Sequence, residues 1–275
     1  MRIRQLLVPF LLLLTAGCAS TRPGGYFEDD GPHDRVPVDI SSIPDAVPRQ
    51  EPLSTRGNNS YAVYGVRYQP LNTAQGYRER GVASWYGKKF HGRRTSSGEA
   101  YDMYAMTAAH KTLPLPSYVR VRNLSNGRSV VVRVNDRGPF LHNRLIDLSY
   151  AAAARIGIVG TGTGLVEVEG ITAETPSTTT ARAPAAASLI STAQAGTPPR
   201  LYLQAGAFAN RDNAEALRNR LVKAKLLPVH VAPVQVDGQE LFRVRLGPLD
   251  SVDASDQLAR RVEAEGLPYP IVVVE

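Results

Sequence analysis

The stretch VVVRVNDRGPF, from Val130 to Phe140, ends in residues that could do chemistry. Valine alternates with polar residues, and the chain then places Asp136 and Arg137 before a Gly-Pro break. A loop at a strand exit can expose a carboxyl group to a groove, where it can act as a general acid or base. Other roles stay open here. Asp136 could accept hydrogen bonds from the following turn, and Arg137 could pair with it or bind a substrate carboxylate.

The stretch SWYG contains Trp85 and Tyr86, on which the face of a sugar ring could stack. Packing in a hydrophobic core explains both residues equally well, because aromatic side chains dominate protein interiors. The histidines His91, His110 and His142 do not fall into a zinc-binding spacing, and no phosphate-binding G-x-x-x-x-G-K-[ST] loop occurs. The sequence therefore predicts neither a metal site nor a cofactor.

The net charge of +7 is concentrated in the middle of the chain. Residues 76–170 contain 14 Lys and Arg against 7 Asp and Glu, whereas residues 200–275 contain ten of each. A basic surface favours an anionic polymer as its partner. We expect a cell-wall glycan bearing lactyl carboxylates, and no nucleic acid, because the N-terminus has the form of an export signal.

This N-terminus has the features of a bacterial secretion signal. Arg2 and Arg4 precede an apolar run that is too short to span a bilayer, and small residues then lead to Cys18. LLTAGC resembles a lipobox, in which the cysteine is lipidated and becomes the new N-terminus. We therefore predict a signal peptide over residues 1–17 and a palmitate-type lipid anchor on Cys18. A plain cleavable signal is the alternative.

Composition divides the rest of the chain into two connectors and two folded units. From Ala19 to about Leu53 the chain has many prolines and acidic residues without apolar periodicity, which predicts a flexible tether, and we assign residues 18–75 to a lipidated N-terminus and a mostly disordered tether. Residues 171–199 are rich in Thr, Ala and Pro, which predicts a flexible linker. The folded units then cover residues 76–170 and 200–275.

The first unit, residues 76–170, shows mostly strand patterns. YVRVRNL alternates strictly, Asn126-Gly127 predicts a tight hairpin turn, and RSVVVRVN returns along the partner strand. IDLSYAAAARIG predicts a strand end, a Ser149 cap and a short helix closed by Gly157. Many short strands with one helix indicate a small closed all-β barrel.

The second unit contains an internal duplication. LYLQAGAF, a helix and LPVHVAPV are followed by LFRVRLGPL, a second helix and LPYPIVVV. The first helix opens with Asp212 and Glu215 in a capping-box arrangement, and the second ends at Gly266. The order βαββαβ predicts a ferredoxin-like α+β fold. The base-stacking signature of an RNA-binding sheet is absent from the sequence.

Residues 81–115, GVASWYGKKFHGRRTSSGEAYDMYAMTAAHKTLPL, together with VVVRVNDRGPF and RLIDLS, resemble the double-psi β-barrel of the rare lipoprotein A family. YLQAGAF and FRVRLGPL resemble a SPOR domain, a module that binds peptidoglycan strands lacking stem peptides. There Gln204 and Arg243 fall on positions that face the glycan. The resemblance implies a septal lytic transglycosylase that cuts such denuded strands.

The resemblance also implies roles for single residues of the barrel. It aligns Asp136 with the catalytic aspartate of the family, and it places Glu99, Asp102 and His110 at the family spacing. Glu99 is then a substrate ligand or alternative acid, Asp102 positions the groove, and His110 hydrogen-bonds Asp136. Solvated loop acids and a satisfied core histidine are the alternatives.

One acid suffices for the chemistry that the resemblance implies. It protonates the leaving oxygen of a glycosidic bond and then takes the proton of the sugar's own C6 hydroxyl, so that a 1,6-anhydro ring closes. We expect endolytic cleavage of MurNAc–GlcNAc bonds at the division septum by a periplasm-facing outer-membrane lipoprotein, with divisome proteins as further partners. A non-catalytic, expansin-like peptidoglycan binder is the competing hypothesis, because double-psi barrels also occur in that class.

Overall fold

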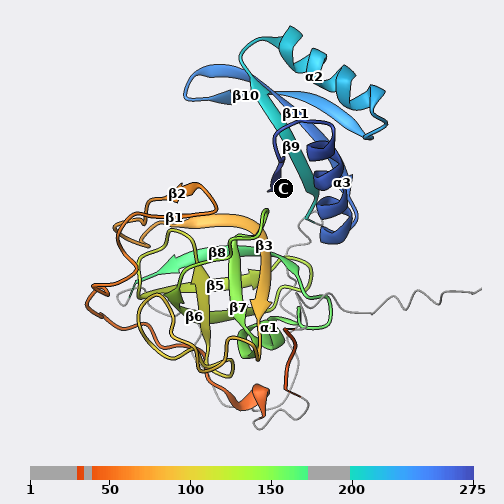
Figure 1. Ribbon diagram of the computed structural model, residues 1–275. Coiled ribbons are helices and arrows are strands. Elements are labelled where there is room, and N and C mark those ends of the chain that lie inside the picture. Colours follow the sequence, from red (N-terminus) through yellow and green to blue (C-terminus); the bar gives the residue numbers. More distant parts are fainter. Residues whose placement is uncertain (1–29, 34–38, 173–198) are drawn as a thin grey trace, which may run out of the picture.

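The computed structural model describes residues 30–33, 39–172 and 199–275, and it contains two folded units (Figure 1). The predicted signal peptide, Cys18 and most of the predicted linker lie outside the described residues. Within the described ranges, no helix has the length and apolar character needed to cross a membrane. The elements are, in chain order, the 3-10 helix η2 (Ile40–Ser42), β1 (Tyr61–Val63), β2 (Val66–Tyr68), β3 (Arg78–Tyr86), β4 (Thr107–His110), β5 (Ser117–Asn123), β6 (Ser129–Asp136), β7 (Ile146–Ser149), α1 (Tyr150–Ile156), β8 (Gly164–Ile171), β9 (Leu201–Phe208), α2 (Arg211–Lys223), β10 (Val229–Val236), β11 (Gln239–Leu249), α3 (Val252–Ala264) and β12 (Ile271–Val274).

Six strands close the first unit into a barrel in the order β3-β7-β4-β6-β5-β8. The pairs β3/β7 and β4/β6 are parallel, and the remaining neighbours are antiparallel. Strand β4 therefore has β7 on one side and β6 on the other. The predicted closed barrel is confirmed, and its mixed strand order fits the double-psi resemblance.

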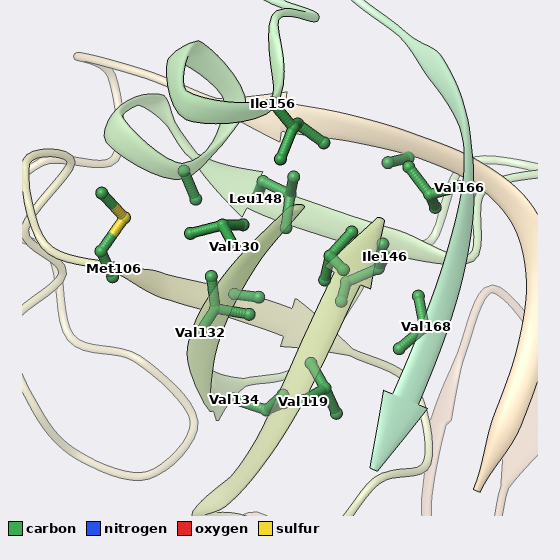
Figure 2. Close-up of a cluster of buried hydrophobic side chains, with 14 of the residues drawn as sticks. Met106, Val119, Val130, Val132, Val134, Ile146, Leu148, Ile156, Val166 and Val168 are labelled. Carbon is green, nitrogen blue, oxygen red and sulfur yellow. The ribbon is translucent and has the colours of Figure 1, made fainter. Parts of the chain in front are cut away.

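Alternation along the strands places every second side chain inside the barrel. In β6, Val130, Val132 and Val134 are at most 1% exposed, and they belong to one cluster with Ile146 and Leu148 of β7 (Figure 2). Burial of each such side chain stabilises the fold by about 1.5–3 kcal/mol. The positions between them face outward, and these are the positions available for chemistry.

The helix α1 after β7 forms as predicted. The Ser149 hydroxyl accepts a hydrogen bond from Ala152 N and so caps the first turn. Gly157 ends the helix in the left-handed conformation, with a φ of 78°. The cap fixes where the strand stops and thereby the position of the residues just before it.

The predicted two-residue turn at Asn126-Gly127 is wrong. Strand β5 ends at Asn123 and β6 begins at Ser129, so the loop is longer. Of the pair, only Gly127 has a positive φ, whereas a primed turn needs positive φ at both residues. Asn126 instead donates from Nδ2 to the Ile156 carbonyl at the end of α1, which holds the loop open.

Residues 39–75 pack against the barrel, so the predicted tether is too long at this end. Ala46 N donates to the Val131 carbonyl at 3.0 Å. Glu51 pairs with Arg133 at 2.8 Å. The prediction relied on the missing apolar periodicity, but this segment is held by backbone hydrogen bonds and ion pairs, which leave no such period.

The second unit is an antiparallel sheet in the order β10-β11-β9-β12. Leu203 of β9 and Val244 of β11 form one apolar cluster with residues of both α2 and α3, so the two helices cover the same face (Figure 1). Among the residues that the structure describes, no helix covers the opposite face of the sheet, which we call the open face (Figure 1). The predicted βαββαβ arrangement is confirmed.

The helix ends of this unit match the predictions in part. Asn210 caps α2, because its side chain accepts a hydrogen bond from Asp212 N at 2.6 Å. The capping box predicted for Asp212 and Glu215 is therefore wrong. Gly266 follows α3 with a φ of 70°, as predicted for a helix C-terminus.

Candidate active site

A row of outward-facing residues crosses four neighbouring strands of the barrel. Ala109 of β4 is the register partner of Asp136 in β6 and of Asp147 in β7, and Asp147 is in turn the partner of Ser84 in β3. Ala108, the neighbour of Ala109, lies in the barrel core, so the row lies on the outer side. The two aspartates are separated by two strand spacings, about 10 Å between their Cα atoms.

A β-bulge brings Asp136 into this row. The register between β4 and β6 shifts after Ala108, so that Asn135 and Asp136 both lie opposite Ala109. In a regular strand Asp136 would point inward with Val134. The extra residue, Asn135, is buried and donates from Nδ2 to a Glu99 carboxylate oxygen at 3.0 Å.

Asp136 is half-buried and receives three hydrogen bonds on Oδ1. The donors are Ser96 N, the Ser96 hydroxyl and Arg137 N, each at 2.7 Å. Ser96 belongs to the loop between β3 and β4, so this loop and the strand exit together hold the carboxyl group. Three donors to one oxygen suit an ionised carboxylate, which accepts hydrogen bonds and donates none.

Asp147 has a different environment from Asp136. Burial raises its pKa from 3.8 to about 6, the hydrogen bond from Ser84 and the nearby charges of Arg144 and Lys111 oppose that rise, and the charge of Asp136 adds to it. The Ser84 hydroxyl donates to Asp147 Oδ1. The row thus holds one carboxyl group whose Oδ1 accepts three hydrogen bonds and another whose pKa is raised by burial, and unlike environments of this kind separate acid from base roles.

Sequence reasoning missed Asp147 because it took IDLS only as the end of a strand. The information was present, however. Asp147 lies between Ile146 and Leu148, which are both fully buried, so alternation alone places its side chain on the outer face. What the sequence did not show is that Asp147 and Asp136 share one neighbour.

Glu99 lies at the edge of the same site as an ionised group. Arg133 Nη1 donates to both of its oxygens, at 2.9 and 2.8 Å, and Asn135 donates to one of them. Burial alone would raise the pKa of Glu99, but the hydrogen bonds from Asn135 and Arg133 outweigh it and lower the pKa. Asp102 is exposed, and its Oδ1 accepts a hydrogen bond from Tyr104 N at 2.9 Å.

The hydrogen bond predicted between His110 and Asp136 is wrong. His110 is 3% exposed, and its Nδ1 accepts hydrogen bonds from Thr112 N and Leu113 N. This assigns the ring proton to Nε2, which donates to the Tyr77 hydroxyl at 3.0 Å. Burial lowers the pKa of His110 to about 3, so the ring is neutral. His110 is the satisfied core histidine of the alternative interpretation.

Arg137 neither pairs with Asp136 through its side chain nor faces a groove, which corrects both predicted roles. It is 8% exposed, and its guanidinium donates to three backbone carbonyls and to the Asn58 side chain. The three carbonyls belong to Gly57, His110 and Leu113. Arg137 therefore ties the N-terminal segment to the strand exit that carries Asp136.

Of the two aromatic residues of SWYG, Tyr86 is buried, which contradicts its predicted sugar-stacking role, whereas Trp85 is half-buried and its stacking role stays a prediction. Tyr86 is 8% exposed and stacks on Tyr101 with ring centroids 3.9 Å apart. Trp85 is the register partner of the buried Leu148 and packs against the barrel core, with its ring centroid 5.5 Å from that of Tyr150. Packing was the alternative that the sequence left open.

Two predicted glycan ligands lie on the open face of the second unit. Gln204 of β9 and Arg243 of β11 alternate with the helix-covered Leu203 and Val244, so their side chains lie on the other side of the sheet. Both side chains are half-buried. As for metals, no group of three or more His, Cys, Asp or Glu side chains within the described ranges could hold an ion.

Comparisons with known proteins match both units. Residues 78–169 match the family described as lytic transglycolase, and residues 197–273 match the SPOR domain family. The chain is 44% identical, over 91% of its length and 86% of the relative's, to the endolytic peptidoglycan transglycosylase RlpA of Pseudomonas aeruginosa strain UCBPP-PA14. It is 55% identical to RlpA of Vibrio cholerae serotype O1, over 60% of this chain and 63% of that protein. The solved SPOR domain of P. aeruginosa RlpA is 41% identical with a TM-score of 0.26, covering 26% of this chain and 96% of that one.

Proposed function

Because the chain belongs to the RlpA family of endolytic peptidoglycan transglycosylases, we propose that it cleaves MurNAc–GlcNAc bonds within glycan strands that lack stem peptides and leaves 1,6-anhydro ends. The observation that carries the proposal is the row in which Asp136 and Asp147 flank Ala109. Two carboxyl groups in unlike environments suit the proton-donating and charge-stabilising roles at a glycosidic bond.

Asp147 supplies the proton in this proposal. With a pKa raised to about 6 by burial, it is still protonated on a useful fraction of molecules near neutral pH. As the bond from C1 to the leaving oxygen breaks, the proton moves from Asp147 to that oxygen. The Asp136 carboxylate stabilises the positive charge that develops at C1.

Ring closure restores the acid. The C6 hydroxyl of the same sugar attacks C1 and gives its proton to the Asp147 carboxylate, so no water is consumed and the 1,6-anhydro ring forms. The intramolecular nucleophile has the advantage of proximity that water lacks. Asp136 keeps the catalytic role that the sequence predicts, but as the anion: the three donors on its Oδ1 favour that role over proton donation.

Glu99 and Asp102 bind substrate in this proposal. The lowered pKa of Glu99, which results from the Asn135 and Arg133 hydrogen bonds against the effect of burial, makes it an acceptor and not an acid. Asp102 is exposed and can accept hydrogen bonds from sugar hydroxyls. Neither residue needs to exchange a proton.

The charge distribution supports denuded strands as the substrate. Removal of the stem peptides leaves lactyl carboxylates along the glycan, and the surplus of positive charge between residues 76 and 170 complements them. The SPOR unit then holds such strands through Gln204 and Arg243 at the division septum. Lipidation of Cys18 anchors the chain to the outer membrane, where the enzyme faces the periplasm and can meet divisome proteins.

The test is to incubate the soluble chain, without residues 1–18, with amidase-treated and untreated sacculi and to identify the products by mass spectrometry. Anhydro-ended fragments from amidase-treated sacculi are expected. Asp147→Asn and Asp136→Asn should each lower the rate by about a hundredfold or more. The matched control is Asp253→Asn, which removes an exposed carboxylate of α3 in the SPOR unit.

Two results would contradict the proposal. Fragments with reducing, non-anhydro ends would indicate a hydrolase. Retention of the parent protein on the sacculi without any fragments would leave a glycan-binding protein of the expansin-like kind.

A further inference from the structure

The SPOR unit rests against the barrel through its edge strand. Strand β12 is at one edge of the sheet, next to β9 only. Its Val272 N donates to Asn143 Oδ1 of the barrel at 3.1 Å. The rings of His142 and Tyr269 stack beside this contact, with centroids 4.4 Å apart and an interplanar angle of 26°. An unpaired sheet edge needs covering, and here the barrel supplies the cover.

An ion pair and an apolar cluster extend the same contact. Arg144 of the barrel donates to both carboxylate oxygens of Asp256 in α3, at 3.2 and 2.5 Å. Val82 points out of the barrel but is only 1% exposed, because it packs with Leu201 and Val274 of the SPOR unit. An outward-facing valine, an edge strand and a paired arginine each find their partner in the other unit, which indicates a specific docked arrangement.

A cavity of about 340 Å³ lies at the junction of the two units. Its barrel wall includes His110 and Lys111, and its SPOR wall consists of Ile271 and Val272. This volume is at the lower end of the range for small-ligand sites, so the cavity is large enough to hold a sugar.

The residues that line the cavity neighbour both the sheet face with Gln204 and the row with Asp147. On the SPOR side, Ile271 is the register partner of Gln204, so the cavity opens beside the open sheet face. On the barrel side, Lys111 follows Ala109 by two residues, and His110, which also lines the cavity, is the register partner of Ile146, the neighbour of Asp147. Gln204, Ile271, Lys111 and Asp147 thus mark a path from one unit to the other.

We propose that the docked SPOR unit passes a glycan strand directly to the barrel, with a sugar of that strand bound in the cavity between Ile271 and Lys111. This inference rests on the proposed function, because it takes the same denuded glycan as ligand. It adds a binding subsite that exists only while the two units are docked. One strand then occupies the SPOR face, the junction and the catalytic row together.

The full chain with Asp147→Asn should bind glycan without cleaving it. Titrating denuded glycan oligosaccharides of increasing length into this variant therefore tests whether one strand binds both units. Oligosaccharides long enough to reach both units should bind at least about a hundredfold more tightly than short ones, because the second contact is intramolecular. Ile271→Trp fills the cavity and should remove this gain. Leu227→Trp is the matched control, since Leu227 is 59% and Ile271 is 64% exposed.

The docked arrangement is tested separately by a charge exchange. Asp256→Arg should abolish the increase in affinity with oligosaccharide length, and the double variant with Arg144→Asp should restore that increase. Glu263→Gln, an exposed carboxylate on the same helix, should leave the gain unchanged. Restoration by the exchange requires the two units to touch, whereas a general effect on the SPOR fold would persist in the double variant.

The outcomes separate this inference from the proposed function. If affinity does not rise with oligosaccharide length, or if Ile271→Trp leaves the rise unchanged, the inference that one strand binds both units is wrong. This holds even if the parent protein produces anhydro fragments. A gain that Ile271→Trp and Asp256→Arg both remove supports the inference, even if no anhydro fragments form and the lytic function fails.

Discussion

The environment of Asp147 predicts how the stability of the barrel depends on pH. Asp147→Asn keeps an acceptor for the Ser84 hydroxyl but removes the ionisable group. The pKa of Asp147 is raised to about 6 by burial, against 3.8 for an ordinary aspartate. Below about pH 4 both the folded and the unfolded chain hold the proton, so the parent protein and the variant should differ little.

The parent protein and Asp147→Asn should come to differ in stability between about pH 4 and about pH 6. In this window the unfolded chain releases the proton and the folded chain keeps it, so the free energy of unfolding of the parent falls as the pH rises. The two pKa values correspond to about 3 kcal/mol. The free energy of unfolding of the variant, minus that of the parent, should therefore be about 3 kcal/mol larger above about pH 6 than at pH 4.

Urea unfolding of both proteins at a series of pH values measures this difference. Ser84→Ala adds a check on the cause: the Ser84 hydrogen bond lowers the pKa of Asp147, so its removal should extend the window to higher pH. A difference between parent and Asp147→Asn that stays within about 0.5 kcal/mol from pH 4 to pH 7 would refute the reasoning. Cleavage by the parent should also fall about tenfold for each pH unit above the pKa if Asp147 is the acid.

Other predictions concern the residues around this pair. Arg137→Met should lower the free energy of unfolding in urea by about 3 kcal/mol or more, since it strands buried carbonyl acceptors; a loss below about 1 kcal/mol would show that Arg137 does not brace the strand exit. Ser96→Ala removes one of the three donors to Asp136 and should slow cleavage by about tenfold without weakening glycan binding; equal rates would exclude a role for that donor. The ring of His110, with a pKa lowered to about 3 by burial, should show no NMR titration between about pH 5 and pH 8, and a midpoint near 6.5 would contradict its burial as a neutral group.

Local patterns in the sequence predicted most of the fold. Strict alternation in YVRVRNL and RSVVVRVN identified β5 and β6, and the Ser149 cap with Gly157 set both ends of α1. The errors occurred where a side chain bonds to something distant in sequence. Asn126 holds the end of α1 instead of forming a primed turn, and Glu51 attaches a segment that composition alone predicts to be disordered.

Less of the candidate site could be predicted, because its side chains also bond to residues that are distant in the sequence. Residue type and strand position identified Asp136, but they could not show that Arg137 turns away to bind three carbonyls of two separate segments. His110 and Tyr86 were chemically suitable for the roles predicted for them. Burial decided against both, and burial is a property of the folded chain.

The active-site row depends on barrel closure and on one inserted residue. Asp136 and Asp147 are eleven residues apart, which in an extended chain is about 36 Å. Because β6 and β7 lie on either side of β4, the same two residues both lie next to Ala109. Without the bulge at Asn135, the alternation of β6 would turn Asp136 into the core beside Val134, where an ionised carboxylate would be costly. The irregularity at the strand exit is therefore what brings the second carboxylate to the outer face.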